Sequence, residues 1–223
     1  MTLLGGMEVR DTTGVRKYVE EDKAAIEDIC YLTGYMGDSA ERFWRHKQSF
    51  VTVWTSYYLN QEPESLYVAT NDDVVVGYLT GCIDTSFAPK FDDVVSSQII
   101  KHGLLLRPGT AGFFWRGMLD SIKDRKAARV DFTDERWPSH LHINLLPVAR
   151  GKGLGRVLME RWFDQLRNSG SPGCHLSTLV ENTRAVSFFE RMGFKCYGEP
   201  ALAPGVRGPA GERIHQQIMV QSV

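Results

Sequence analysis

The sequence predicts an α/β protein with a mixed, twisted sheet of about seven strands and helices on both faces. Segments of strand-like composition alternate with segments of helical periodicity along most of the 223 residues. Hydrophobic residues make up 43% of the chain and charged residues 24%, which is typical of a folded globular protein. A chain of this length can bury a large core, and we expect a single domain over residues 1–223.

The balance of charge argues against two classes of binding partner, nucleic acids and membranes. The chain has 26 lysine and arginine residues against 27 aspartate and glutamate residues, a formal net charge of −1. This balance provides neither a basic surface for nucleic acid nor a polybasic segment for a membrane. The sequence has no apolar run of membrane-spanning length, and its first residues lack the basic and apolar regions of a signal peptide. We therefore expect a cytoplasmic protein with reduced cysteines and no nucleic-acid or membrane partner.

The elements of the N-terminal half are predicted from hydrophobic periodicity and turn residues. Residues 1–13 are glycine-containing and predict a loose arm. The elements expected after it are a strand at 15–19, a helix beginning at Glu20, a helix from about Ala40 to Tyr58, and a hairpin of strands at 65–70 and 74–83. Residues 85–138 form an insertion of mixed pattern, with helices expected at 92–102 and 113–129.

The last third has a more regular alternation. The expected elements are strands at 140–146 and 174–180, helices at 153–167 and 182–192, and closing strands at 194–199 and 213–220. The segment 200–211 is rich in glycine and proline and predicts a loop. The insertion thus falls between the third and fourth strands.

The segment Leu145–Gly155 carries the first chemical signal, because it joins a strand directly to a helix. Its three glycines leave backbone N–H groups uncovered beside the charges of Arg150 and Lys152, which favours a phosphate or pyrophosphate. A P-loop requires Ser or Thr after the lysine, and a dinucleotide-binding motif requires its third glycine one position later. The spacing that fits is Arg-x-x-Gly-x-Gly, formed by Arg150, Gly153 and Gly155.

At these residues the sequence resembles the GNAT superfamily of acyl-CoA-dependent N-acetyltransferases. The run from Asn182 to Phe194 is similar to the second signature of that family, Asn-x-x-Ala-x-x-Phe-Tyr-x-x-x-Gly-Phe, and residues 15–22 resemble its usual first strand and helix start. More narrowly, residues 141–147, the Thr33-Gly34-Tyr35 turn and the insertion look like the acetyltransferase-like domain of O-GlcNAc hydrolase and its stand-alone bacterial relatives. In that group, acetyl-CoA binding does not guarantee acetyltransferase activity.

The resemblance implies acetyl-CoA as the acyl donor, bound where the fourth strand splays from the fifth. The Leu145 backbone would contact the pantetheine arm, and its N–H would polarise the thioester carbonyl. The remaining cofactor contacts implied are the backbone amides of Arg150, Gly151, Lys152, Gly153, Leu154 and Gly155, and the side chains of Asn182 and Ser187. Asn182 has an equally good interpretation as an ordinary helix N-cap. No metal is implied.

Acetylation of an amine requires a neutral nitrogen, so a base must take its proton. His140 and His142 alternate with Asn144 on one face of the fourth strand, and an imidazole there titrates in the right range, near its usual pKa of about 6.5. Asp84, at the end of the third strand, is the second candidate. Phe189 stands where many family members have a tyrosine that protonates the leaving thiolate, and Tyr35 or Tyr78 could replace it.

The function expected from these residues is transfer of an acetyl group from acetyl-CoA to a primary amine, by direct attack in a ternary complex. The acceptor is not readable from the sequence, and a homodimer is compatible with it. The alternative is an acetyl-CoA-binding pseudoenzyme with a sensing or scaffolding role, which the phenylalanine at position 189 favours.

Overall fold

A seven-stranded sheet organises the computed structural model, which describes residues 13–123 and 132–223. In chain order the strands are β1 (Gly14–Lys17), β2 (Leu66–Asn71), β3 (Val74–Cys82), β4 (Ser139–Leu145), β5 (Gly173–Leu179), β6 (Lys195–Arg207) and β7 (Arg213–Ser222). Their order in the sheet is β1-β2-β3-β4-β5-β7-β6, and every neighbouring pair is antiparallel except β4 and β5. The predicted mixed sheet is confirmed.

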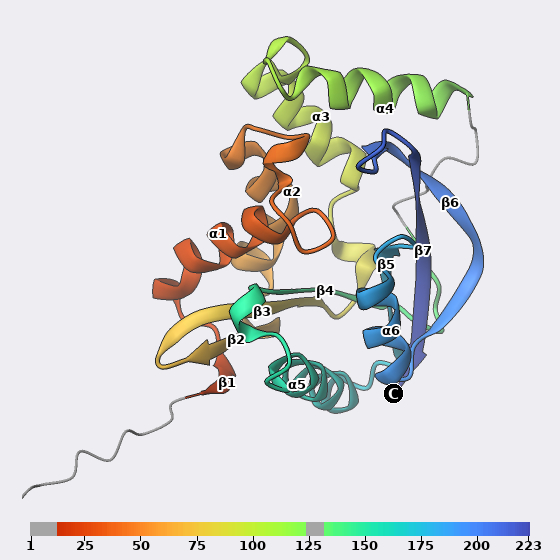
Figure 1. The fold of residues 1–223 in the computed structure, drawn as a ribbon. Helices are drawn as coiled ribbons and strands as arrows, with labels where there is room; N and C mark the ends of the chain where they lie inside the picture. Colours follow the sequence, from red (N-terminus) through yellow and green to blue (C-terminus); the bar gives the residue numbers. More distant parts are fainter. Residues whose placement is uncertain (1–12, 124–131) are drawn as a thin grey trace, which may run out of the picture.

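Helices cover both faces of this sheet (Figure 1). They are α1 (Lys23–Thr33), α2 (Lys47–Gln61), α3 (Phe91–His102), α4 (Ala111–Lys123), α5 (Leu154–Ser169) and α6 (Thr183–Arg191). In Figure 1, α1 and α2 lie above strands β1–β4, whereas α5 lies below them. The sheet therefore separates two hydrophobic cores, one on the side of α5 and α6 and the other on the side of α1 and α2.

The alternation of side chains along β4 connects this strand to both cores. Leu141, Ile143 and Leu145 point to the α5 side, where the apolar face of α5, including Leu158 and Trp162, is fully buried. The even-numbered residues of β4 point to the opposite side, toward α1 and α2. The prediction that His140, His142 and Asn144 share one face of the fourth strand agrees with this arrangement.

The helix expected from Ala40 to Tyr58 is wrong in its first part. A 3-10 turn, Ala40–Arg42, is capped by Ser39, and the α-helix begins only at Lys47. His46 precedes it, and its Nδ1 accepts a hydrogen bond of 3.2 Å from the Ser49 N–H, which caps the helix. Phe43 and Trp44 pack into the core from this turn, and their spacing from the apolar residues of α2 matches a helical period.

The loop expected at 200–211 is also wrong, because β6 continues through most of it to Arg207. Pairing with β7 persists at Ala201 and Leu202, with irregular register before and after. Since β6 is an edge strand, one side of its backbone needs no partner, and Pro200 and Pro204 are tolerated there. Only the turn between β6 and β7 lies outside the strands.

The insertion between β3 and β4 is helical, as predicted. Helix α3 agrees with the range expected for it, whereas α4 begins at Ala111 and is described to Lys123; the rest of the helix expected to residue 129 lies outside the described residues. Asp120 fixes α4 to β6, because its buried carboxylate accepts hydrogen bonds from the Gly205 N–H at 3.0 Å and from Arg207 at 2.9 Å. The insertion thus packs against the far edge of the sheet.

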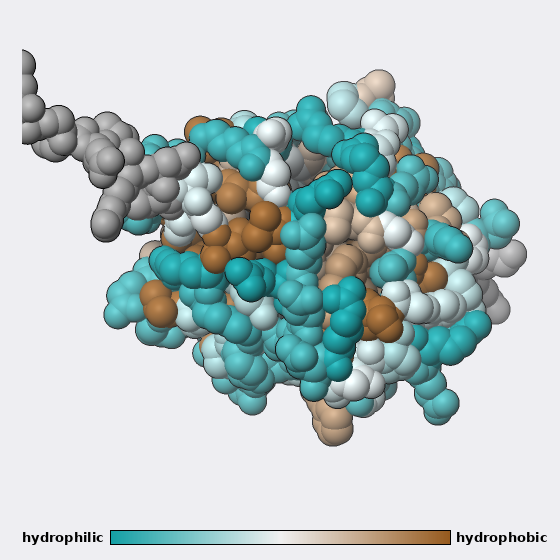
Figure 2. All heavy atoms as spheres, turned by 90° about the horizontal axis from the view of Figure 1, so that it is seen from below, coloured by the Kyte–Doolittle hydropathy of each residue, from teal (hydrophilic) through white to brown (hydrophobic). Residues whose placement is uncertain are grey.

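The surface on the α5 side is mainly hydrophilic, with hydrophobic side chains gathered in a few patches (Figure 2). In the described part of the chain, no helix combines the length and apolar character needed to cross a bilayer. The four cysteines form no disulfide: Cys30, Cys82 and Cys174 are buried, and Cys196 is exposed.

Candidate active site

The parallel strands β4 and β5 diverge almost as soon as they meet. They pair only at Ser139 with Cys174 and at His140 with His175, although β4 continues to Leu145 and β5 to Leu179. A gap therefore opens in the middle of the sheet toward the carboxyl ends of both strands. The splay expected between the fourth and fifth strands is present.

Backbone groups of β4 line this gap. The Leu146 N–H donates to the Val76 carbonyl of the β3 edge at 2.9 Å, and backbone groups of an antiparallel strand alternate in direction. The N–H and C=O groups of Ile143 and Leu145 consequently point away from β3, toward the gap, beyond the last residue that pairs with β5. An extended ligand in the gap can hydrogen-bond to them as a strand would.

The position of Leu145 is fixed by close packing on both sides. A Cβ atom added to Gly77, directly opposite on β3, would lie 2.3 Å from Leu145 Cδ2. One added to Gly155 at the start of α5 would lie 3.1 Å from Leu145 Cδ1. The two glycines therefore allow the strand, its neighbour and the helix to approach closely, and they hold the Leu145 backbone at the edge of the gap.

The turn from β4 to α5 forms an open cradle. Gly151 and Gly153 both have φ of +77°, a conformation that favours glycine, and a Cβ added at either would meet no atom within 4 Å. The first hydrogen bond of α5 runs from Val157 N–H to Gly153, so the N–H groups of the preceding helical residues have no intrahelical partner. This cradle has the free donors and positive helix end that suit a pyrophosphate.

The charged side chains of the cradle are tied to neighbouring segments. Arg150 donates to the Gly37 carbonyl at 3.0 Å, which links the cradle to the turn after α1. The exposed Lys152 donates to the Asn71 side chain at the end of β2. Both cations stay beside the cradle, but these bonds make the backbone the main donor to a ligand.

Helix α6 carries the two side chains, Asn182 and Ser187, that the resemblance implies as cofactor contacts. The Asn182 side chain accepts a hydrogen bond of 3.3 Å from the Ala185 N–H, which is the ordinary N-cap role. Ser187 is exposed on this helix. Phe188 approaches Gly155 at the start of α5, whereas Phe189 is buried in the core on that side. Position 189 is therefore a packing position in this chain.

His140 is held at both ring nitrogens. Its Nε2 lies 2.7 Å from the Tyr58 hydroxyl and its Nδ1 lies 2.7 Å from the Thr85 hydroxyl. The Thr85 hydroxyl also lies 2.7 Å from the Pro138 carbonyl oxygen, which can only accept. Thr85 therefore donates to Pro138, the Nδ1–H donates to Thr85, and Nε2 accepts from Tyr58. With both nitrogens used, His140 is a positioned neutral ring.

His142 is the freer of the two histidines. In the described part of the chain neither of its nitrogens has a hydrogen-bond partner, and its ring packs edge-on against Trp54 and Tyr58 of α2. Burial, with a smaller effect of His175, lowers the pKa of His142 to about 4. Burial also holds the pKa of His140 well below its usual range, aided by His142 and His175. The structure thus replaces the value near 6.5 expected from sequence with a lower one.

The other candidate proton carriers have local partners. Asp84 accepts a hydrogen bond of 2.9 Å from the Ser86 N–H and caps a short 3-10 turn. The Tyr35 hydroxyl donates to the Arg207 carbonyl at 2.8 Å. Tyr78 is buried on the α1 side, where it interacts with Cys30. Each of these side chains is already engaged by a neighbouring group.

Two residues that shape this site were missed in the sequence. Tyr58 and Thr85 hold His140, although they lie 82 and 55 residues from it along the chain. Tyr58 follows Trp54 by one helical turn, which marks the face of α2 turned toward the sheet and could have identified it. Nothing in the local sequence distinguishes Thr85.

Comparisons with known proteins agree on the class of fold. A family model described as "Acetyltransferase (GNAT) domain" matches residues 121–196. N-alpha-acetyltransferase 30 of Schizosaccharomyces pombe is 24% identical over 172 residues, which cover 77% of this chain and 79% of that protein. The crystal structure of SsHAT is similar, with a TM-score of 0.64, 25% identity, and coverage of 94% of this chain and 98% of that one. The Salmonella typhimurium yncA structure, which contains its cofactor acetyl-CoA, has a TM-score of 0.55 and 17% identity, with 94% and 93% covered.

Proposed function

We propose that the chain is a GNAT acetyltransferase that transfers the acetyl group of acetyl-CoA to a primary amine by direct attack in a ternary complex. The observation that carries this proposal is the early end of the pairing between β4 and β5, followed in the chain by the open cradle at the start of α5. The gap suits an extended arm with amide groups, and the cradle suits a pyrophosphate. Coenzyme A contains both in one molecule.

The backbone would perform most of the donor chemistry. The N–H groups at Gly151–Gly155 would bind the pyrophosphate, and the backbone of Ile143 and Leu145 would pair with the pantetheine amides. The Leu145 N–H would donate to the thioester oxygen as negative charge develops on it. A fixed donor at such a position contributes roughly 3 kcal/mol to the stabilisation of the transition state.

We infer that His142 accepts the proton that the attacking amine loses. The amine nitrogen forms a bond to the thioester carbon, the C–S bond breaks, and the nitrogen loses one proton. Because the pKa of His142 is lowered to about 4, its ring is neutral at pH 7 and has a nitrogen free to accept that proton. His140 would support it by packing beside it, with ring centroids 6.0 Å apart.

The leaving group places a small demand on the protein. A thiol with a pKa of about 8.5 leaves as a thiolate at pH 7 at a cost of about 2 kcal/mol, so a side-chain acid is helpful but not required. Release of the thiolate is therefore compatible with Phe189, which cannot donate a proton, and with the engaged hydroxyls of Tyr35 and Tyr78.

A second candidate function is an acetyl-CoA-binding pseudoenzyme. The buried Phe189 favours it, as does the low basicity of His142. The narrower resemblance of the sequence to the acetyltransferase-like domain of O-GlcNAc hydrolase points in the same direction. In this case the gap and the cradle would bind acetyl-CoA, and no acceptor would be consumed.

Release of free CoA, followed with a thiol reagent, distinguishes the two functions. Peptides with free N-terminal amines come first in the panel of acceptors, since N-alpha-acetyltransferase 30 is a relative, followed by amino sugars and aminoglycosides. Acceptor-dependent, steady release of CoA supports the enzyme. Thermal stabilisation by acetyl-CoA without CoA release from any acceptor supports the pseudoenzyme, and the absence of both contradicts the proposed site.

A further inference from the structure

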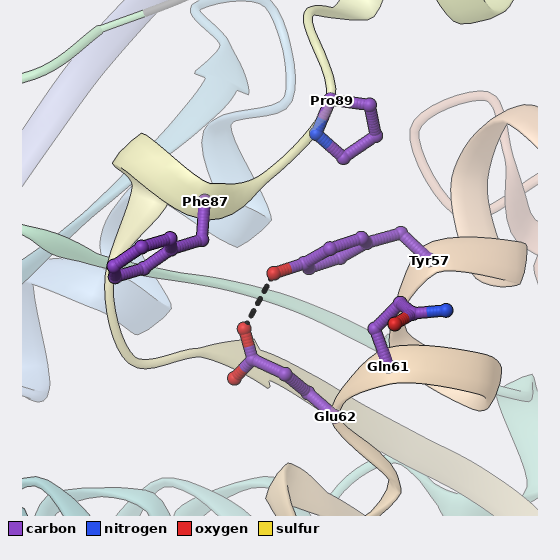
Figure 3. A pocket seen from close by; sticks show the side chains of 5 residues that line it. All are labelled: Tyr57, Gln61, Glu62, Phe87 and Pro89. Atoms are coloured by element: carbon purple, nitrogen blue, oxygen red, sulfur yellow. Dashed lines mark hydrogen bonds between the residues drawn. The ribbon is translucent and has the colours of Figure 1, made fainter.

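A cavity of about 560 Å³ opens at the C-terminal end of α2, outside the gap and the cradle. Its lining residues are Tyr57, Gln61, Glu62, Phe87 and Pro89. In Figure 3 the Glu62 carboxylate and the Tyr57 hydroxyl point toward each other in the middle of the cavity, with Phe87 on one side and Gln61 on the other. A single carboxylate is thus surrounded by aromatic and neutral groups.

The Glu62 carboxylate is held in place by hydrogen-bond donors from neighbouring segments. The Tyr57 hydroxyl donates to Oε1 at 2.7 Å, and the Ile83 N–H donates to Oε2 at 3.0 Å. In the described part of the chain no lysine, arginine or histidine nitrogen lies within 4 Å of this carboxylate. Oε2 also accepts a long hydrogen bond of 3.5 Å from the Ser65 hydroxyl, whereas Oε1 keeps a free lone pair, so the negative charge is fixed in position and has no cationic partner.

Phe87 provides the second observation. Its side chain is 79% exposed at the mouth of the cavity, where an aromatic ring gains little from burial. With Tyr57 it places aromatic rings on two sides of the carboxylate (Figure 3). Rings beside a carboxylate attract an organic cation, because the ring faces and the carboxylate both carry negative potential.

The cavity lies next to the proposed acceptor side of the active site. The rings of Tyr57 and Tyr58 are 5.4 Å apart, and Tyr58 in turn packs 5.5 Å from His142. The hydroxyl of Tyr57 also reaches Cys82 Sγ at 3.6 Å, and Cys82 pairs with His140 across the sheet. A ligand in the cavity is therefore separated from the histidines by one aromatic side chain.

We propose that this cavity binds the protonated amino group of an organic cation, with Glu62 as the anionic partner and Phe87 as an aromatic wall. The site is separate from the proposed acetyl transfer, because Tyr58 lies between the cavity and His142. It favours alkylammonium ligands over neutral ligands of the same shape.

Direct binding of butylammonium, without acetyl-CoA, tests the proposal, with 1-butanol as the neutral probe of the same shape. Titration followed by ligand-observed NMR should show that the wild type prefers butylammonium. Glu62→Gln should weaken butylammonium binding about tenfold, as expected for loss of a hydrogen bond to a charged group. Phe87→Ala, at an exposed position, should weaken it severalfold. Glu64→Gln removes an exposed carboxylate outside the cavity and should leave binding unchanged.

The outcomes separate this inference from the proposed function. The cation site is overturned if the wild type binds the two probes with equal Kd. It is also overturned if Glu62→Gln binds butylammonium with a Kd within twofold of the wild-type value. If Glu62→Gln does not fold, unchanged binding in Phe87→Ala overturns it instead. Stabilisation by acetyl-CoA and release of CoA are measured separately, so the cation site can fail while the acetyltransferase proposal stands, and the reverse.

Discussion

Replacing Gly153 with glutamate should abolish most of the stabilisation that acetyl-CoA gives to the folded protein. Gly153 begins α5 with φ of +77°, and a Cβ added there meets no atom within 4 Å. The new side chain therefore enters the open cradle and brings a negative charge to the place proposed for the pyrophosphate. Two like charges 4 Å apart at an effective dielectric constant of 20 repel by about 4 kcal/mol.

The expected loss of stabilisation follows from mass action. At a ligand concentration about 100 times its Kd, the wild type gains about 2.7 kcal/mol in free energy of unfolding. A variant that binds about a hundredfold more weakly gains about 0.4 kcal/mol at the same concentration. For a chain of this size, the wild-type gain corresponds to an increase of about 5–10 °C in Tm.

Gly153→Ala is the matched control, measured in the same thermal melts with and without acetyl-CoA. A side chain at positive φ costs about 1–2 kcal/mol in both variants, so both should melt earlier without ligand. The alanine adds no charge and enters open space, so it should keep most of the ligand-induced shift. If acetyl-CoA raises the Tm of Gly153→Glu as much as that of the wild type, the assignment of the pyrophosphate to this cradle is refuted.

Acidification should destabilise the fold between about pH 6.5 and pH 4. Burial lowers the pKa values of His140, His142 and His175, that of His142 to about 4. The unfolded state therefore binds more protons than the folded state in this window, and the free energy of unfolding decreases as the pH is lowered. Thermal melts at pH 7 and pH 5 measure this, and equal Tm values would contradict it. His142→Ala should lower kcat/KM by roughly 10²–10⁴-fold and leave the affinity for acetyl-CoA unchanged. The acidic limb of the pH profile of kcat/KM for the wild type should lie near pH 4. Full activity of the variant would remove His142 from the proton path. Asp120→Asn leaves the Arg207 cation without its buried partner and should cost about 3 kcal/mol in urea denaturation. A cost below about 1 kcal/mol would mean that α4 is held mainly by apolar packing.

The parts of the fold that the sequence predicted are those governed by local signals. The cradle could be recognised because a strand, three glycines and an amphipathic helix follow one another without interruption. The shared face of His140 and His142 followed from the two-residue period of a strand. These features depend on neighbours in the chain, and the structure agrees with them.

The features that were missed depend on contacts between distant segments. Residues 200–207 contain prolines and glycines that favour a loop, and only their position at the sheet edge lets them continue β6. The use of both nitrogens of His140 requires Tyr58 and Thr85, from a helix and a turn far away in sequence. The lowered pKa of His142 likewise comes from burial under α2, which no spacing within its own strand reveals.

The narrow junction between β4 and β5 gives the insertion a mechanical consequence. Two residue pairs join β4 to β5, so few sheet hydrogen bonds connect β1–β4 to β5–β7. Helix α4 bridges the same two halves: Phe113 and Phe114 contact Phe43 and Trp44 of one half, and Asp120 accepts a hydrogen bond from β6 of the other. The insertion therefore provides a second connection between the halves of the sheet, independent of the β4–β5 pairs.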